Sequence, residues 1–154
     1  HDETAHRAEH SLEVQIPFLQ YFKPDVKIVP LVVSHIPYFL CVQAAHDLAT
    51  AIHEYGKSVL LVASSDMSHY ESRESASSKD RLALQNIEKM NPKGLYETVL
   101  NNNITMCGIM PVTISLLTAI KLGATKAELV RYTDSGEASG DTRQVVGYAG
   151  LIIS

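Results

Sequence analysis

The sequence has only two cysteines, no long apolar run and fewer basic than acidic residues. Cys41 and Cys107 are too few to build a disulfide framework, which favours a reducing compartment. The longest apolar run, Ile109–Ile120, is too short to span a bilayer. A formal net charge of −4 disfavours nucleic acid or an anionic membrane as the main partner. Since no signal peptide is recognisable either, these absences predict a soluble cytoplasmic protein.

The sequence also lacks an initiator methionine, because it begins at His1. That start fits a processed product or a part of a longer protein. The 154 residues, of which 45% are hydrophobic, suit one ordinary domain whose core needs neither disulfides nor a structural metal. No internal repeat or low-complexity tract divides them. We therefore expect residues 1–154 to belong to a single domain.

Apolar patterning predicts an α/β fold. Val26–Ser34 and Ser58–Ser64 are apolar runs typical of buried strands, although Pro30 places the first at a sheet edge or bulge. Between them, apolar spacing over Tyr38–Tyr55 predicts a helix that ends at Gly56. A strand, a helix and a strand in this order predict a parallel βαβ unit with a right-handed crossover.

The rest of the chain adds further helices, two strands and a polar loop. The loop is expected over Glu71–Asp80, which is rich in serine and charge. Strands are expected over Glu128–Thr133 and Val145–Ile153. The expected helices are Thr4–Phe22 with a kink or boundary at Pro17, Lys79–Met90, Asn91–Leu100 and Pro111–Leu122. Together these elements predict a three-layer α/β/α sandwich with a mostly parallel sheet.

Polar residues follow the predicted strand Ser58–Ser64 directly. In open α/β sheets, ligands bind at the carboxyl ends of strands. Asp66 and His69 are three residues apart in this segment. A carboxylate at that spacing is close enough to orient the imidazole, and both could face one metal or substrate. The simpler interpretation is an aspartate-capped turn with an exposed histidine, and spacing alone leaves both open.

Cys107 is the second candidate, because it lies just before the helix that Pro111 opens. The positive end of a helix dipole favours a thiolate, which is both a nucleophile and a soft metal ligand. The alternative is a small buried hydrophobe, as most free cysteines are. For Cys41, on the apolar face of a predicted helix, that second interpretation is favoured.

Residues 6–10 read H-R-A-E-H and match the inverted zinc-peptidase pattern H-x-x-E-H. On a helix His6 and His10 would share a face, with Glu13 one turn further on. Such a peptidase also needs an acidic ligand from a later helix, and five-residue patterns arise by chance. The polar segment Asp134–Asp141 is a further candidate for the border of a site, although a solvated loop is the simpler interpretation.

Four motifs in order resemble the Memo family, whose prokaryotic members are called AmmeMemoRadiSam system protein B. They are E-H-S-L-E-V-Q-I-P at 9–17, S-S-D-M-S-H-Y at 64–70, C-G at 107–108 followed by Pro111, and Y-T-D-S-G through V-V-G-Y-A-G between 132 and 150. The resemblance implies the fold of class III extradiol (LigB-like) dioxygenases, which use non-haem iron. It extends over nearly the whole chain.

The same resemblance implies a metal site. Cys107 matches the metal-binding cysteine of the family, and His69, with Asp66, matches the histidine segment that lines the site. Ser65 belongs to that segment, and Glu9 and His10 match a motif beside the same pocket. The family's other ligands are two histidines in N-terminal motifs that do not occur here. The chain therefore resembles the C-terminal portion of a Memo protein.

These expectations lead to two main functional hypotheses. In the first, the protein holds iron or copper and is redox-active, with an unknown substrate. A thiolate makes the ligand set softer than that of a dioxygenase, so the resemblance alone does not imply ring cleavage. In the second, a non-enzymatic module reuses the pocket to bind a peptide or protein, in association with a radical-SAM protein. A half-length chain should also expose apolar surface, which the missing N-terminal half or self-association would cover.

Overall fold

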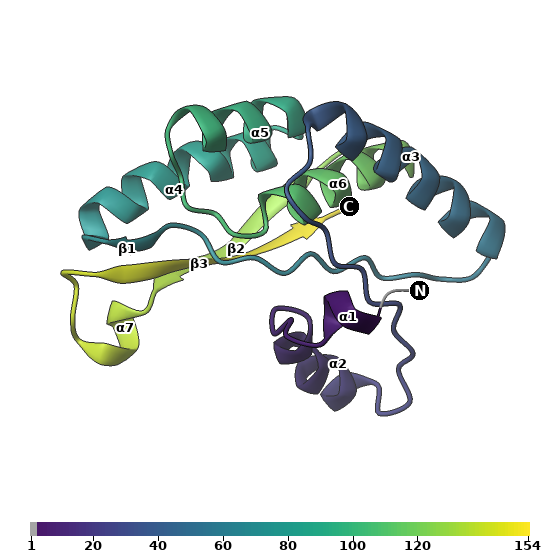
Figure 1. Cartoon of the computed structure of the whole chain (residues 1–154), viewed down its shortest axis with the longest axis horizontal. Coiled ribbons are helices and arrows are strands. Elements are labelled where there is room, and N and C mark those ends of the chain that lie inside the picture. The colour runs from purple at the N-terminus through teal and green to yellow at the C-terminus, as the bar shows by residue number, and fades with distance from the viewer. Residues whose placement is uncertain (1–2) are drawn as a thin grey trace. The chain divides into compact units, whose positions relative to one another are not determined.

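The computed structural model describes residues 3–154, which fall into two units that meet between His35 and Ile36 (Figure 1). In the first unit, helix α1 (Glu3–His6) is followed by a 3-10 turn, η1 (Glu13–Gln15), and helix α2 (Ile16–Phe22). The single helix predicted over Thr4–Phe22 is thus divided. Pro17 lies in the first turn of α2, where its missing N–H removes no hydrogen bond.

The first unit has no buried side chain among residues 3–35. Val26–Ser34, predicted as a strand, has no regular secondary structure and no ladder partner. A strand forms only when a neighbour satisfies its N–H and C=O groups, and no described segment does so here. The apolar pattern of these residues is real, but a pattern alone supplies no pairing partner.

The second unit contains five helices among its described residues: α3 (Tyr38–Tyr55), α4 (Arg73–Glu88), α5 (Pro92–Asn101), α6 (Ile109–Lys121) and α7 (Gly136–Ser139). Helix α3 has its predicted bounds and ends at Gly56, whose φ of 65° is left-handed. Helix α5 is also close to its prediction, with Asn91 accepting a hydrogen bond from the N–H of Gly94.

Helix α4 corrects the prediction of a loop over Glu71–Asp80. The helix begins at Arg73 because Ser72 caps it: the N–H of Ser75 donates to Ser72 Oγ over 3.3 Å. The serines that suggested a loop lie on its surface, whereas a stripe at helical spacing is buried. The members of that stripe are Ala76, Asp80, Ala83, Leu84 and Ile87.

The sheet has three strands, β1 (His69–Glu71), β2 (Ala127–Asp134) and β3 (Val145–Ile153), in the order β1-β3-β2. Both pairings are antiparallel, with Ala127 opposite Ile153 and Asp134 opposite Gly147 in the longer one. The expected Ser58–Ser64 strand has no ladder, and the two strands of the expected βαβ unit do not pair. The fold is therefore α/β with a small antiparallel sheet, and the parallel three-layer sandwich is not seen.

The core of the second unit lies between its helices and the sheet. Helix α6 packs against α3 and α5, and α4 packs against α5 and all three strands (Figure 1). Leu95, Leu116 and Val145 are among its fully buried side chains. No helix in residues 3–154 has both the length and the apolar character that crossing a membrane would require.

Candidate metal centre

The segment that carries Asp66 and His69 is held by backbone hydrogen bonds to β3. The N–H of Met67 donates to the carbonyl of Gly147, and the N–H of Gly147 donates to the carbonyl of Ser68, both over 2.9 Å. On its other side, the N–H of Ser68 donates to Asp80 Oδ1 on α4 over 2.9 Å. Met67 and Ser68 are therefore held in place directly before β1 begins, whereas residues 58–64 belong to no ladder.

Cys107 reaches the same place from the turn before α6. The N–H of Gly108, the residue before the helix, donates to Ser65 Oγ over 2.9 Å. A Cβ at position 108 would lie 2.5 Å from the Cβ of Ser65 and 2.6 Å from the carbonyl oxygen of Ser64. Only glycine allows so close an approach, so the C-G dipeptide brings the thiol against the 64–69 segment.

Three ligand atoms converge at this point. One atom each from Asp66, His69 and Cys107 lies within 4.8 Å of the other two. His69 Nε2 is 3.4 Å from Asp66 Oδ2, and the backbone N–H of Asp66 donates to Cys107 Sγ over 3.2 Å. The histidine and aspartate are half-buried, and the cysteine is exposed. The sequence predicted this meeting of an imidazole and a thiol from two distant segments, and the structure brings them together.

Thr105 determines which nitrogen of His69 is available. The ring Nδ1 lies 2.7 Å from the carbonyl oxygen of Thr105. A carbonyl oxygen can only accept, so Nδ1 carries a proton, and in the neutral ring Nε2 then has the lone pair. The threonine hydroxyl also accepts the backbone N–H of His69 over 2.7 Å. This pairing of a ring N–H with a carbonyl is typical of metal-binding histidines.

The geometry fits a metal ion. Bonds of about 2.0 Å to nitrogen or oxygen and about 2.3 Å to sulfur place tetrahedral ligands roughly 3.5 Å apart. The 3.4 Å between the imidazole and carboxylate atoms agrees with this spacing. One nitrogen, one oxygen and one sulfur donor suit copper, zinc or iron better than magnesium or calcium. Three protein ligands also leave at least one position open for a further ligand.

The histidines near the N-terminus do not have the geometry that the H-x-x-E-H pattern would require. Helix α1 ends at His6, so His6 and His10 do not share a helical face. His10 lies 4.0 Å from Glu13, and both are exposed. Hydrogen bonds from the side chain and from the backbone N–H of Ser11, the latter over 2.6 Å, lower the pKa of the Glu9 carboxyl group. No metal-binding cluster in residues 3–154 includes any of these side chains.

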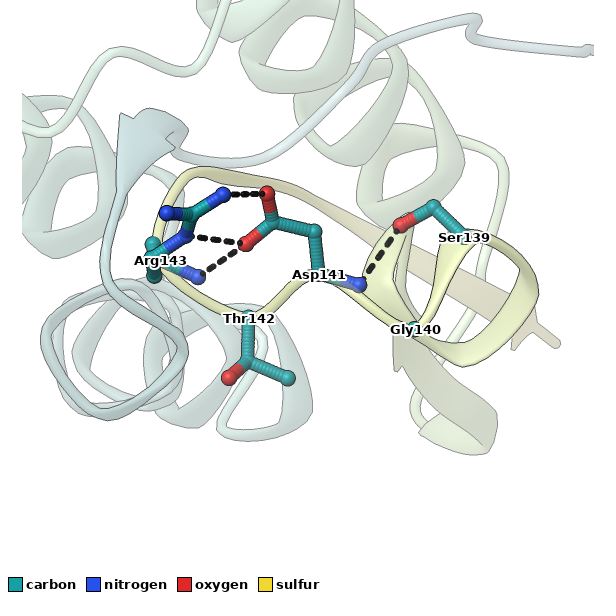
Figure 2. Close-up of a pocket in the computed structure, with 5 residues that line it drawn as sticks. All are labelled: Ser139, Gly140, Asp141, Thr142 and Arg143. Atoms are coloured by element: carbon teal, nitrogen blue, oxygen red, sulfur yellow. Dashed lines mark hydrogen bonds and ion pairs between the residues drawn. The ribbon is translucent and has the colours of Figure 1, made fainter.

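Two other candidates have structural roles. Cys41 is buried on α3 with its Sγ 3.9 Å from Met110 Sδ, and burial raises the pKa of its thiol. The segment that follows β2 forms α7 and a hollow lined by residues 139–143 (Figure 2). There the carboxylate of Asp141 pairs with Arg143 over 2.8 Å, so the polar groups of the loop satisfy one another. Neither candidate belongs to the Asp66–His69–Cys107 cluster.

Sequence reasoning missed two residues that support the centre. Thr105 stands two positions before Cys107, and Asp80 stands in the middle of α4. Their roles depend on a carbonyl group and on a buried carboxyl group, which no short motif reveals. The only available signal was an acidic residue on what proves to be the buried stripe of an amphipathic helix.

Comparison with known proteins identifies the family. The sequence profile of the Memo-like proteins matches residues 1–152. The chain belongs to the Memo family. A MEMO1 family protein of Methanocaldococcus jannaschii is 45% identical to this Memo chain over 157 residues, which cover 99% of the chain and 54% of the relative. A MEMO1 family protein of Aquifex aeolicus is 43% identical over 98% of the chain and 56% of the relative. The Memo chain thus spans about half the length of the curated relatives it matches.

Proposed function

We propose that this Memo chain contributes Asp66, His69 and Cys107 to a non-haem metal site that takes iron or copper. The observation that carries the proposal is the convergence of the three donor atoms within 4.8 Å. The Thr105 carbonyl supports it, because it leaves the ring nitrogen nearest Asp66 free to coordinate. A chance cluster of polar side chains would not require the His69 ring to be held in one tautomer by Thr105.

Each residue has a separate role in the proposed site. Cys107 supplies the soft ligand, and the N–H of Asp66 stabilises negative charge on its sulfur. His69 supplies a neutral nitrogen ligand. Asp66 either completes the ligand set or, from 3.4 Å, holds a proton beside the imidazole. Bound iron or copper would supply one-electron redox chemistry, for a substrate that the residues do not identify.

The whole protein is proposed to have a larger, LigB-like fold. Val59, Leu60 and Val62 lie in the extended segment 58–64, which belongs to no ladder, and they are exposed, as is Val29 in the first unit. Such apolar extended segments are suited to being strands of a mostly parallel three-layer sheet once partners are present. The partner would be an N-terminal half of a full-length Memo protein or a second copy of the chain. The N-terminal half would also supply the remaining ligands.

A test of the metal site compares the two cysteines of the chain. Elemental analysis of the intact protein, purified under reducing conditions, should find iron or copper in the parent and in Cys41→Ala, and should lose it in Cys107→Ser. Cys41→Ala is the matched control because it removes a thiol that does not reach the site. Metal content that is unchanged in Cys107→Ser, or zinc alone in the parent, would contradict the proposal.

The second candidate function is a binding module without chemistry, which would act beside a radical-SAM protein. The exposed apolar side chains favour it, since Phe39 on α3 is 68% exposed and Leu60 is 76% exposed. Partner affinity, measured in one double variant, distinguishes the two functions. A binding module keeps its partner affinity in the double variant His69→Ala/Cys107→Ser, whereas a metal-dependent function is lost.

A further inference from the structure

Asp80 is a carboxyl group inside the core. It lies on α4 with none of its surface exposed. Oδ1 accepts the N–H of Ser68 over 2.9 Å, and Oδ2 accepts the hydroxyl of Tyr132 on β2 over 2.7 Å. No ion pair among residues 3–154 involves Asp80. Burying a polar group in this way is costly unless each oxygen is hydrogen-bonded.

The surroundings of Asp80 are shaped to admit its carboxyl group. A Cβ on Gly147 of β3 would collide with Asp80 Oδ2 and would lie 3.2 Å from the Tyr132 hydroxyl oxygen. The absence of a side chain at this position lets the carboxyl group lie directly against the β3 backbone. Burial and the hydrogen bond to Asp80 also raise the pKa of Tyr132, so its hydroxyl remains a donor. Asp80 therefore joins α4, β2 and β3 at one point.

That point is also where the metal-centre segment is anchored. Ser68 lies between Asp66 and His69. Asp80 accepts a hydrogen bond from the N–H of Ser68, and the N–H of Gly147 donates to the carbonyl of Ser68. The hydroxyl of Ser68 is buried and has no hydrogen-bond partner among residues 3–154. The side chain of Ser68 thus contributes no polar contact, and its backbone bonds hold it. Without Asp80, the Ser68 N–H would be buried without an acceptor.

We propose that Asp80 is a positioning residue of the Asp66–His69–Cys107 centre. It fixes the peptide between Asp66 and His69, so that Nε2 lies 3.4 Å from Asp66 Oδ2 while Nδ1 reaches the Thr105 carbonyl. The consequence for metal binding rests on the proposed function. The consequence for the backbone of Ser68 and the ring of His69 does not, because both can be measured without metal.

The test uses Asp80→Ala and Asp80→Asn in the intact protein. Alanine removes both acceptors. Asparagine keeps a carbonyl oxygen for the Ser68 N–H, and the Tyr132 hydroxyl can turn to accept from the new amide. Ile87→Ala is the matched control, since Ile87 is likewise buried on the same helix, seven residues beyond Asp80. Tyr132→Phe removes only the donor to Oδ2.

Three measurements are taken on each variant: hydrogen exchange at the Ser68 amide, the His69 tautomer from ring nitrogen NMR shifts, and Co²⁺ affinity. Asp80→Ala should speed Ser68 exchange, mix the His69 tautomers and weaken Co²⁺ binding by about tenfold or more. Asp80→Asn should restore all three towards the parent. Ile87→Ala should lower the melting temperature without mixing the tautomers or weakening Co²⁺ binding.

A protected Ser68 amide and an unmixed His69 tautomer in folded Asp80→Ala would overturn the proposal, as would tautomer mixing in Ile87→Ala to the same degree. If Asp80→Ala does not fold, Tyr132→Phe decides: partial mixing of the His69 tautomers supports the proposal, and a parent-like ring overturns it. A parent that binds no Co²⁺ would contradict the proposed function alone, because the two NMR measurements would still report on Asp80.

Discussion

Thr105 holds His69 at two places, through its hydroxyl and through its carbonyl. The hydroxyl fixes the backbone from which the ring projects, and the carbonyl fixes the tautomer. Both contacts come from the turn that also carries Cys107 two residues later. A single turn thus supplies one proposed ligand and orients another, which explains how a short segment can organise the centre.

Replacing Thr105 with valine should separate these two contacts. Valine has nearly the same shape but cannot accept the His69 N–H, while the backbone carbonyl remains for Nδ1. We expect Co²⁺ affinity to fall by about tenfold with the Nδ1–H tautomer retained. Thr105→Ser is the control, because it keeps the hydroxyl and should bind like the parent. Equal affinities for the valine and serine variants, measured by titration calorimetry, would contradict this role.

Gly108→Ala should damage both the fold and the centre. The added methyl would lie 2.5 Å from the Cβ of Ser65, and the neighbouring carbonyl of Ser64 cannot move aside cheaply. Overpacking of this kind costs about 1–3 kcal/mol of unfolding free energy. Gly150→Ala is the control, since nothing lies within 4 Å of its added Cβ. Urea denaturation should show the difference, and a Gly108→Ala protein as stable as Gly150→Ala would count against the close approach.

At the scale of elements, the sequence predicted some features well and others poorly. Helix α3 was confirmed because its ends are marked locally, by apolar periodicity and by Gly56. The start of α4 was missed because the serines were weighed as loop formers, whereas Ser72 acts as a helix cap. The pairing of Ser58–Ser64 could not be read from its composition, because pairing depends on which segment lies alongside. Local rules nominated His69 and Cys107 separately, and the resemblance to the Memo family implied that they share one site, because the strand expected over Ser58–Ser64 has no ladder.

Helix α4 is tied to the end of β2 by Arg73 and Asp134. Two nitrogens of the Arg73 guanidinium donate to the two carboxylate oxygens, over 2.7 and 2.8 Å. This pairing is the main cause that lowers the pKa of Asp134 below its usual value of 3.8. Because the folded pKa is below the unfolded one, the pair adds stability at any pH above about 3.8. That stability is lost as the pH falls through the folded pKa.

Removing the pair should therefore make the protein more sensitive to acid. In Arg73→Met, the acid-unfolding midpoint should move to higher pH, and stability near neutral pH should fall as well. Arg143→Met is the control, because its partner Asp141 is exposed and lies within the same loop. Circular dichroism during acid titration measures the midpoints. An Arg73→Met midpoint equal to that of the control would show that the pair does not link α4 to β2.

At the scale of the whole molecule, large apolar side chains are left in contact with water. Phe39 and Leu60 in the second unit are exposed. The first unit exposes Phe18, Tyr21 and Phe22, and none of its residues 3–35 is buried. A segment without a core cannot offset the entropy lost on ordering its backbone. The chain also spans only 54% of the length of its relative from Methanocaldococcus jannaschii. Both facts support the proposal that this surface is buried against a further segment of the protein or against a second copy of the chain.

Leu60→Lys tests whether the surface is an interface. Leu60 is 76% exposed, so within this chain the change should alter the unfolding free energy by about 0.5 kcal/mol or less. Association is different, because a charge buried at an interface without a partner is costly. In sedimentation at rising concentration, the parent should therefore associate and Leu60→Lys should do so much less. Val130→Lys, at a β2 position that is 63% exposed, is the control. A parent that stays monomeric throughout would exclude a second copy as the cover, and equal weakening by both lysines would place the interface elsewhere than at Leu60.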